Sequence, residues 1–282
     1  MTAIGGATAR VDQNLFSGRR ARLRDLFAAE WIKFWSLRST TIALAAVTAW
    51  YLYRTYQLAQ ESYTSWLGIP AAIRGAYDPS MVFRGPEWFL IMVVAGSVGA
   101  LTVVGEHASG LIRTTFTAVP DRLRVAAAKV AVVAVVMTGV GAIVAAGSFA
   151  VEQAALRGHH IDFSPSEPGA RSLVVSTTLL LPVCALAGMA IGALIRNTAV
   201  TVFVTCVLFI LVPLFFKSPS TRWAVDVGNA LPCYAWGRLT MMGRHAHILG
   251  AVPGEAAAWT AFAGWSVVSA VIVATSLHRR DV

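Results

Sequence analysis

The sequence predicts an all-α polytopic membrane protein, on the basis of its excess of apolar residues and its apolar runs of membrane-spanning length. Of its 282 residues, 56% are hydrophobic and only 13% are charged, and the mean hydropathy is +0.64. Soluble chains carry roughly 25% charged residues, and a soluble fold of this size could not bury so much apolar surface. The excess is expected to face lipid. This composition excludes a cytosolic enzyme, a disordered scaffold and a nucleic-acid-binding module, so no nucleic-acid partner is expected.

Six apolar runs are candidates for transmembrane helices, each of which needs about 20 apolar residues. They are residues 39–54, 87–105, 125–151, 172–195, 198–216 and 256–277. The first is short, and Arg54 at its end is expected to snorkel to the interface. Residues 1–38 are then predicted to form an N-terminal tail with an interfacial helix, and residues 39–282 a six-helix transmembrane domain.

The distribution of basic residues predicts the orientation of these spans. An even number of spans places both termini on one side. Lys and Arg are denser in the segments on that side than in the loops on the other, which predicts that both termini are cytoplasmic. The net charge of +9 has the same explanation. The first forty residues contain no uninterrupted apolar core followed by a cleavage site, so no removable signal is expected.

An amphipathic helix is predicted between Arg20 and Arg38, before the first span. Its apolar residues recur at three- to four-residue spacing among basic ones, and they are Leu23, Phe27, Trp31 and Phe34. A basic helix with aromatic anchors suits the inner headgroup layer. The alternative is a soluble helix that packs on another domain.

Two cytoplasmic connections differ sharply in size. The segment after the second span, GEHASGLIRTTFTAVPDRLRVAAAK, has helical apolar spacing up to Pro120, which is expected to end that helix. It therefore predicts a short cytoplasmic helix. The turn between the fourth and fifth spans is only Arg196–Asn197, which predicts a tight hairpin.

Within the spans, small residues and prolines predict how the helices pack. Gly188 and Gly192, like Ala95 and Gly99, are four residues apart and would allow close helix approach. Pro182 and Pro213 are expected either to kink their helices or to be tolerated in them. Before the sixth span, the stretch GNALPCYAWGRLTMMGRHAHILG contains apolar segments too short to cross, which predicts short re-entrant or interfacial helices.

The residues that familiar enzymes and pumps require are missing from the sequence. No lysine follows a glycine, so there is no Walker A loop, and there is no HExxH, no GxSxG and no paired-carboxylate cluster. Away from their ends the spans hold almost no ionisable residue, which disfavours ion-coupled transport. Histidines in the outer loops are expected to be solvated rather than metal-bound, and the three cysteines to be packing or unpaired residues. We therefore expect no catalytic, cofactor or metal site in this chain.

The segments AEWIKFWSLRSTTIAL, GEHASGLIRTTFTAVPDRLRVAAAKVAVV and LPCYAWGRLT, with the six-span layout, resemble an ABC-2-type ABC transporter permease of the actinobacterial kind. The resemblance implies a half-transporter in a bacterial plasma membrane that exports an amphipathic or hydrophobic substrate. Its implied partners are membrane lipid, a second permease subunit in a homo- or heterodimer, and two copies of an ABC ATPase that bind the ATP and Mg²⁺ missing here.

The same resemblance implies roles for particular residues. The segment between the second and third spans would be the coupling helix that contacts the ATPase, with Glu106, Arg113, Thr114, Pro120 and Arg122 belonging to it. The short helices before the sixth span would form the outer gate, with Leu231, Tyr234, Trp236 and Met241 in it. Simple anchoring at the interface is the alternative role for each set.

Two other classes of protein are compatible with the sequence. One is a self-standing secondary carrier or channel, for which backbone carbonyls would have to hold a coupling ion. The other is a membrane-embedded enzyme or a regulatory anchor, for which the outer histidines would be the place to look for a metal.

Overall fold

The structure is a computed structural model that describes residues 22–70, 85–108, 121–156, 169–216, 221–240 and 254–279. Every regular element in these ranges is a helix. In chain order they are α1 (Leu23–Ser36), α2 (Arg38–Leu67), α3 (Glu87–Ala108), α5 (Arg122–Leu156), α6 (Ala170–Ile195), α7 (Thr198–Cys206), a π-helical turn (Val207–Leu211), α8 (Val212–Phe215), α9 (Arg222–Ala230), α10 (Pro232–Leu239) and α11 (Glu255–Arg279).

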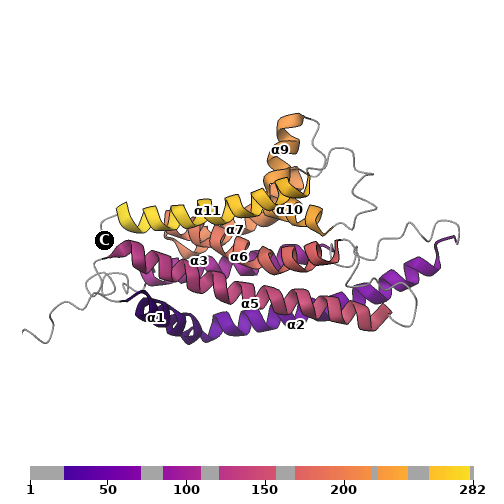
Figure 1. Ribbon diagram of the computed structural model, residues 1–282, viewed down its shortest axis with the longest axis horizontal. Coiled ribbons are helices and arrows are strands. Elements are labelled where there is room, and N and C mark those ends of the chain that lie inside the picture. The colour runs from indigo at the N-terminus through magenta and orange to yellow at the C-terminus, as the bar shows by residue number, and fades with distance from the viewer. Residues whose placement is uncertain are drawn as a thin grey trace, which may run out of the picture.

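The long helices lie side by side along one axis, with α6 at the centre of the bundle (Figure 1). Helix α6 contacts α3, α5 and α11, and most of its apolar residues are buried. Among the described residues, five helical segments are long and apolar enough to cross a membrane, and they are Glu87–Glu106, Arg122–Leu156, Ala170–Ile195, Thr198–Phe215 and Glu255–Leu277. These five correspond to the predicted second to sixth spans, as expected of a helical membrane protein.

Helix α2 departs from the prediction for the first span. It does not end at Arg54 but continues to Leu67, and it is not among the five apolar segments. The second half of α2 has many polar residues, which lowers its hydropathy, and Thr55 and Ala59 in this half are buried. Arg54 therefore lies within α2, and its guanidinium forms an ion pair with Glu87 at the start of α3, at 2.9 Å.

Glycines allow the central helices to approach each other at backbone distance, as the small-residue spacing predicted. A Cβ atom on Gly188 of α6 would lie 1.8 Å from the carbonyl oxygen of Gly96 on α3. A Cβ on Gly99 would lie 1.9 Å from the carbonyl oxygen of Ala185. Neither position can hold a side chain without separating α3 from α6, because the obstacle is backbone.

The two prolines are accommodated differently. Pro182 lies within α6, where it leaves the carbonyl of Thr178 without a helical donor. Gly141 of α5 packs against that carbonyl, since a Cβ there would lie 2.2 Å from the Thr178 oxygen. Pro213 follows the π-helical turn, a local widening that relieves the crowding a proline causes.

The predicted hairpin between the fourth and fifth spans is confirmed. Helix α6 ends at Ile195, and Arg196 takes the left-handed conformation with φ 59°. Asn197 then caps α7, because its side-chain oxygen accepts a hydrogen bond from the Val200 N–H at 3.1 Å.

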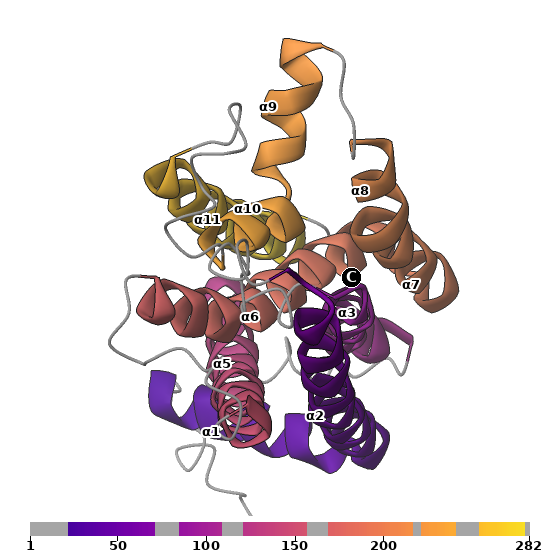
Figure 2. The same ribbon diagram turned by 90° about the vertical axis from the view of Figure 1, so that its right-hand side faces the viewer.

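Helix α1 runs across the end of the bundle rather than along it, and the end of α11 lies at the same end (Figures 1 and 2). The four apolar residues predicted to form one face do not share one environment. Phe34 is buried in the core and Phe27 is half-buried, whereas Leu23 and Trp31 are exposed. The buried side of α1 consists of Leu26, Glu30 and Phe34, and it packs mainly on α5.

At the opposite end of the bundle, two short helices precede α11, where the sequence predicted them. Helix α10 packs on α6 and α11, whereas α9 projects away from the bundle in both views (Figures 1 and 2).

Candidate functional site

Four charged side chains meet where α1 crosses the ends of α3 and α5, and we call them the charge ring. They are Glu30 and Lys33 of α1, Glu106 of α3 and Lys129 of α5. The Lys129 ammonium lies 2.5 Å from Glu30 Oε2 and 2.9 Å from Glu106 Oε1. The Lys33 ammonium lies 2.8 Å from Glu30 Oε1 and 3.1 Å from the same Glu106 oxygen. Each charge therefore contacts two of opposite sign.

Because the charge ring is largely buried, separating any of its charged side chains from the others is energetically costly. The side chains of Lys129 and Glu30 are each only 6% exposed. Lys129 uses all three N–H bonds, since it also donates to the Thr102 carbonyl at 3.5 Å. A buried charge that loses its partner costs about 3–5 kcal/mol, so none of these groups can leave the others cheaply.

Lys33 is the most exposed member of the charge ring, at 38%. Burial acts to lower its pKa, but the hydrogen bonds and negative charges of Glu30 and Glu106 outweigh that effect and raise the pKa above the usual value for lysine. Because the pKa of Lys33 is higher in the folded protein than in the unfolded chain, its interactions with Glu30 and Glu106 contribute stability at all pH values below the ordinary lysine pKa. That stability is lost only as the pH rises through the pKa of Lys33 in the folded protein. Lys33 thus stays charged throughout the physiological range.

The charge ring contains one of the residues singled out from the sequence. Glu106, assigned by resemblance to the coupling element, lies in the last turn of α3, and Arg122 begins α5. Arg113, Thr114 and Pro120, from the same element, lie outside the described residues. The sequence reasoning missed Glu30, Lys33 and Lys129 as partners of Glu106. The available signal was Lys129 itself, a charge placed inside an apolar helix.

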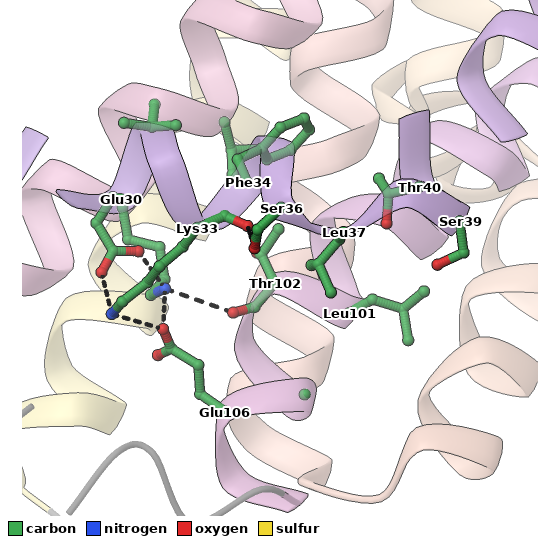
Figure 3. Close-up of a pocket in the computed structure, with 14 residues that line it drawn as sticks. Glu30, Lys33, Phe34, Ser36, Leu37, Ser39, Thr40, Leu101, Thr102 and Glu106 are labelled. Carbon is green, nitrogen blue, oxygen red and sulfur yellow. Dashed lines mark hydrogen bonds and ion pairs between the residues drawn. The ribbon is translucent and has the colours of Figure 1, made fainter. Parts of the chain in front are cut away.

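A cavity of about 410 Å³ adjoins the charge ring, under the elbow between α1 and α2 (Figure 3). Its apolar wall includes Phe34, Leu37 and Leu101. In Figure 3 the charge ring lies on one side of the view and the Ser39 and Thr40 hydroxyls on the other, with Leu37 and Leu101 between. A concave, mostly apolar space of this volume with a few polar groups is typical of small-molecule sites.

Three buried aromatic side chains form a column away from the charge ring, and one of them was assigned to the outer gate. Trp236 of α10 is buried, and its indole N–H donates to Thr177 Oγ1 at 3.1 Å. Its ring packs against Trp88 in a tilted arrangement, with a centroid separation of 4.4 Å, and the Trp88 and Tyr51 ring centroids are 4.6 Å apart. The column thus joins α2, α3 and α10.

The other outer-gate residues have different positions. Leu231 is buried between α9 and α10, and the half-buried Tyr234 donates its hydroxyl hydrogen to the Pro213 carbonyl at 2.8 Å. Met241 lies outside the described residues. The tyrosine bond ties α10 to the end of α8.

The structure also locates some of the side chains that could ligate a metal or act as nucleophiles. The described residues contain no cluster of three or more His, Cys, Asp or Glu side chains suited to a metal. His159, His160, His245 and His247 lie outside the described ranges. Burial raises the pKa of the Cys233 thiol to about 12, so that thiol stays protonated and is a poor nucleophile.

Neither the family models nor the curated proteins that were searched give a match to this chain.

Proposed function

We propose that this chain is the membrane-spanning subunit of an ABC-type exporter, in which a separate ATPase hydrolyses the ATP. The charge ring is the observation that carries this proposal. It joins α1 to the end of α3 and the beginning of α5. These two helices bracket residues 109–120, the segment that the family resemblance assigns to ATPase docking.

This arrangement supports a mechanical role for the ends of α3 and α5. A displacement applied between them is transmitted to α1, because separating the four side chains would strand buried charges. The same two helices flank α6 and contact it at backbone distance, through Gly188 and Gly141. A displacement of the ends of α3 and α5 by the ATPase would therefore be transmitted to both α1 and α6.

In the proposed topology α2 is the first of six spans, and both termini are cytoplasmic in a bacterial plasma membrane. The end of α11 lies at the same end of the bundle as α1, as this topology requires (Figure 1). Two such subunits, identical or different, would pair above two ATPases. Substrate would pass between the paired subunits.

The proposed transport cycle is alternating access. ATP binding closes the two ATPases and draws the coupling segments together, which shifts each bundle. The Tyr51–Trp88–Trp236 column is buried within a single bundle, so in this cycle it holds α2, α3 and α10 together during the shift and does not line the path between subunits. An apolar path suits an amphipathic or hydrophobic substrate, since the long apolar helices hold few ionisable groups away from their ends.

The test of this proposal is capture of a soluble ATPase. The tagged chain, purified from its native membrane, is expected to retain an ATP-hydrolysing partner. Replacing residues 113–120 with a Gly-Ser linker of equal length should abolish that capture, because it removes the docking segment without touching a described helix. The retained partner is measured by mass spectrometry and by ATP hydrolysis of the purified fraction.

A matched linker in an outer loop provides the control. The same length of Gly-Ser replacing residues 243–250 should leave capture unchanged, since those residues are proposed to lie on the other side of the membrane. Equal capture by wild type and the 113–120 variant would contradict the docking role. Transport by the chain alone would favour a carrier or channel, and turnover without transport would favour an enzyme.

A further inference from the structure

The cavity beside the charge ring has features that the transport proposal does not use. Polar groups that are available for hydrogen bonding to a ligand lie on one side of the cavity, at the start of α2. Thr40 lines the cavity, is 6% exposed, and its hydroxyl has no hydrogen-bond partner among the described residues. Ser39 lines the same side.

The backbone at this place also offers donors. Arg38 and Ser39 form the first turn of a 30-residue helix, and their N–H groups have no backbone acceptor in the described part of the chain. The next N–H, of Thr40, bonds to the Leu37 carbonyl at 3.0 Å. The N-terminal end of a helix carries partial positive charge and favours anions. The Arg38 side chain, which is exposed in the same turn, adds a full positive charge.

The rest of the cavity is suited to hydrocarbon. Phe34, Leu37 and Leu101 line it together with Val132 and Val133. On the far side, Glu30 and Lys129 are occupied with bonds inside the charge ring and to the backbone, since both Glu30 oxygens and all three Lys129 hydrogens are used. The free polar groups of Ser39 and Thr40 are therefore at one end of an apolar space.

We propose that this cavity binds one amphipathic anion, with a phosphate or carboxylate head at the start of α2 and its aliphatic part along the apolar wall. The spare groups can all donate a hydrogen bond, which selects a head rich in acceptors. The cavity lies beside α1, the helix proposed to lie at the inner membrane surface, so a phospholipid and a free fatty acid are the two sources of such a ligand. This site requires no ATPase, and only its placement at the inner membrane surface rests on the proposed topology.

The experiment is native mass spectrometry of the full-length chain released from an uncharged glycoside detergent. The probes are phosphatidylglycerol, laurate, inorganic phosphate and uncharged diacylglycerol. One molecule of phosphatidylglycerol or laurate is expected to remain bound, and whichever of the two binds more tightly identifies the source. Equal binding of diacylglycerol, or of inorganic phosphate alone, would overturn the proposal, because either would show that head and chain are not both recognised.

Variants locate the site. Thr40→Val should weaken binding of the retained anion about tenfold, the loss expected for one hydrogen bond to a charged group, whereas Thr40→Ser should keep it. Leu101→Trp should abolish binding because it fills the cavity. Thr178→Val is the matched control, since that hydroxyl bonds to the Val174 carbonyl of its own helix. If Thr40→Val and Leu101→Trp both bind the anion as the wild type does, the assignment is wrong.

Discussion

Replacing Lys129 with methionine is expected to be among the most damaging single changes in this protein. The substitution removes the buried cation between the Glu30 and Glu106 carboxylates and leaves them bridged only by the partly exposed Lys33 of the charge ring. Removal of one partner from a buried ion pair costs about 3–5 kcal/mol. In a chain of this size that corresponds to a fall in Tm of roughly 5–15 °C, measured by thermal unfolding of the purified protein.

Two variants separate the loss of charge from the loss of packing. Lys33→Met should cost much less, because Lys33 is partly exposed and Lys129 still bridges both carboxylates. The double variant Glu30→Gln with Lys129→Gln should recover much of the lost stability, since it removes one charge of each sign and keeps the Lys33–Glu106 pair at 3.1 Å. Equal losses for Lys129→Met and Lys33→Met would contradict the account, because the burial of Lys129 would then not set the cost of its removal.

A single added methyl group at Gly188 is the second large effect. The new Cβ would lie 1.8 Å from the Gly96 carbonyl oxygen, and that oxygen belongs to backbone that cannot turn aside. Gly188→Ala should therefore push α6 away from α3, at a cost of about 1–3 kcal/mol or more. The expected result is a lower Tm and a smaller yield of monodisperse protein.

Gly139→Ala is the matched control for this change. Gly139 lies in α5, and a Cβ there would have no heavy atom within 4 Å. Alanine at an open helical position is neutral or slightly stabilising, by up to about 1 kcal/mol. If both variants unfold at the wild-type temperature, the close approach of α3 and α6 is not as described.

The sequence predicted the apolar helices well because their signal is local. The expected spans 87–105 and 172–195 agree closely with α3 and α6, and the two-residue turn after α6 is where it was predicted. Small-residue spacing also predicted that the second and fourth spans allow close helix approach, although not that these two spans pack on each other. Each of these features depends on residues that are near one another in the chain.

The first span and the charge ring were harder to predict because they depend on distant contacts. Arg54 suggested the end of the first span, but α2 continues to Leu67 and Arg54 pairs with Glu87, which is 33 positions away in the chain. Glu30 and Lys129 are separated by 99 positions, so their pairing requires the crossing of α1 over α5 to be known first. A charge inside an apolar helix indicates a partner, but does not say which one.

The most direct test of the proposed function is to measure ATP hydrolysis and substrate accumulation in vesicles that contain this chain, first alone and then with the ATPase captured on it. We expect neither activity from the chain alone, and both once the captured ATPase and Mg²⁺-ATP are supplied on the side of α1. Hydrolysis of ATP by the chain alone, or uphill flux without the second protein, would contradict a membrane subunit that is driven from outside.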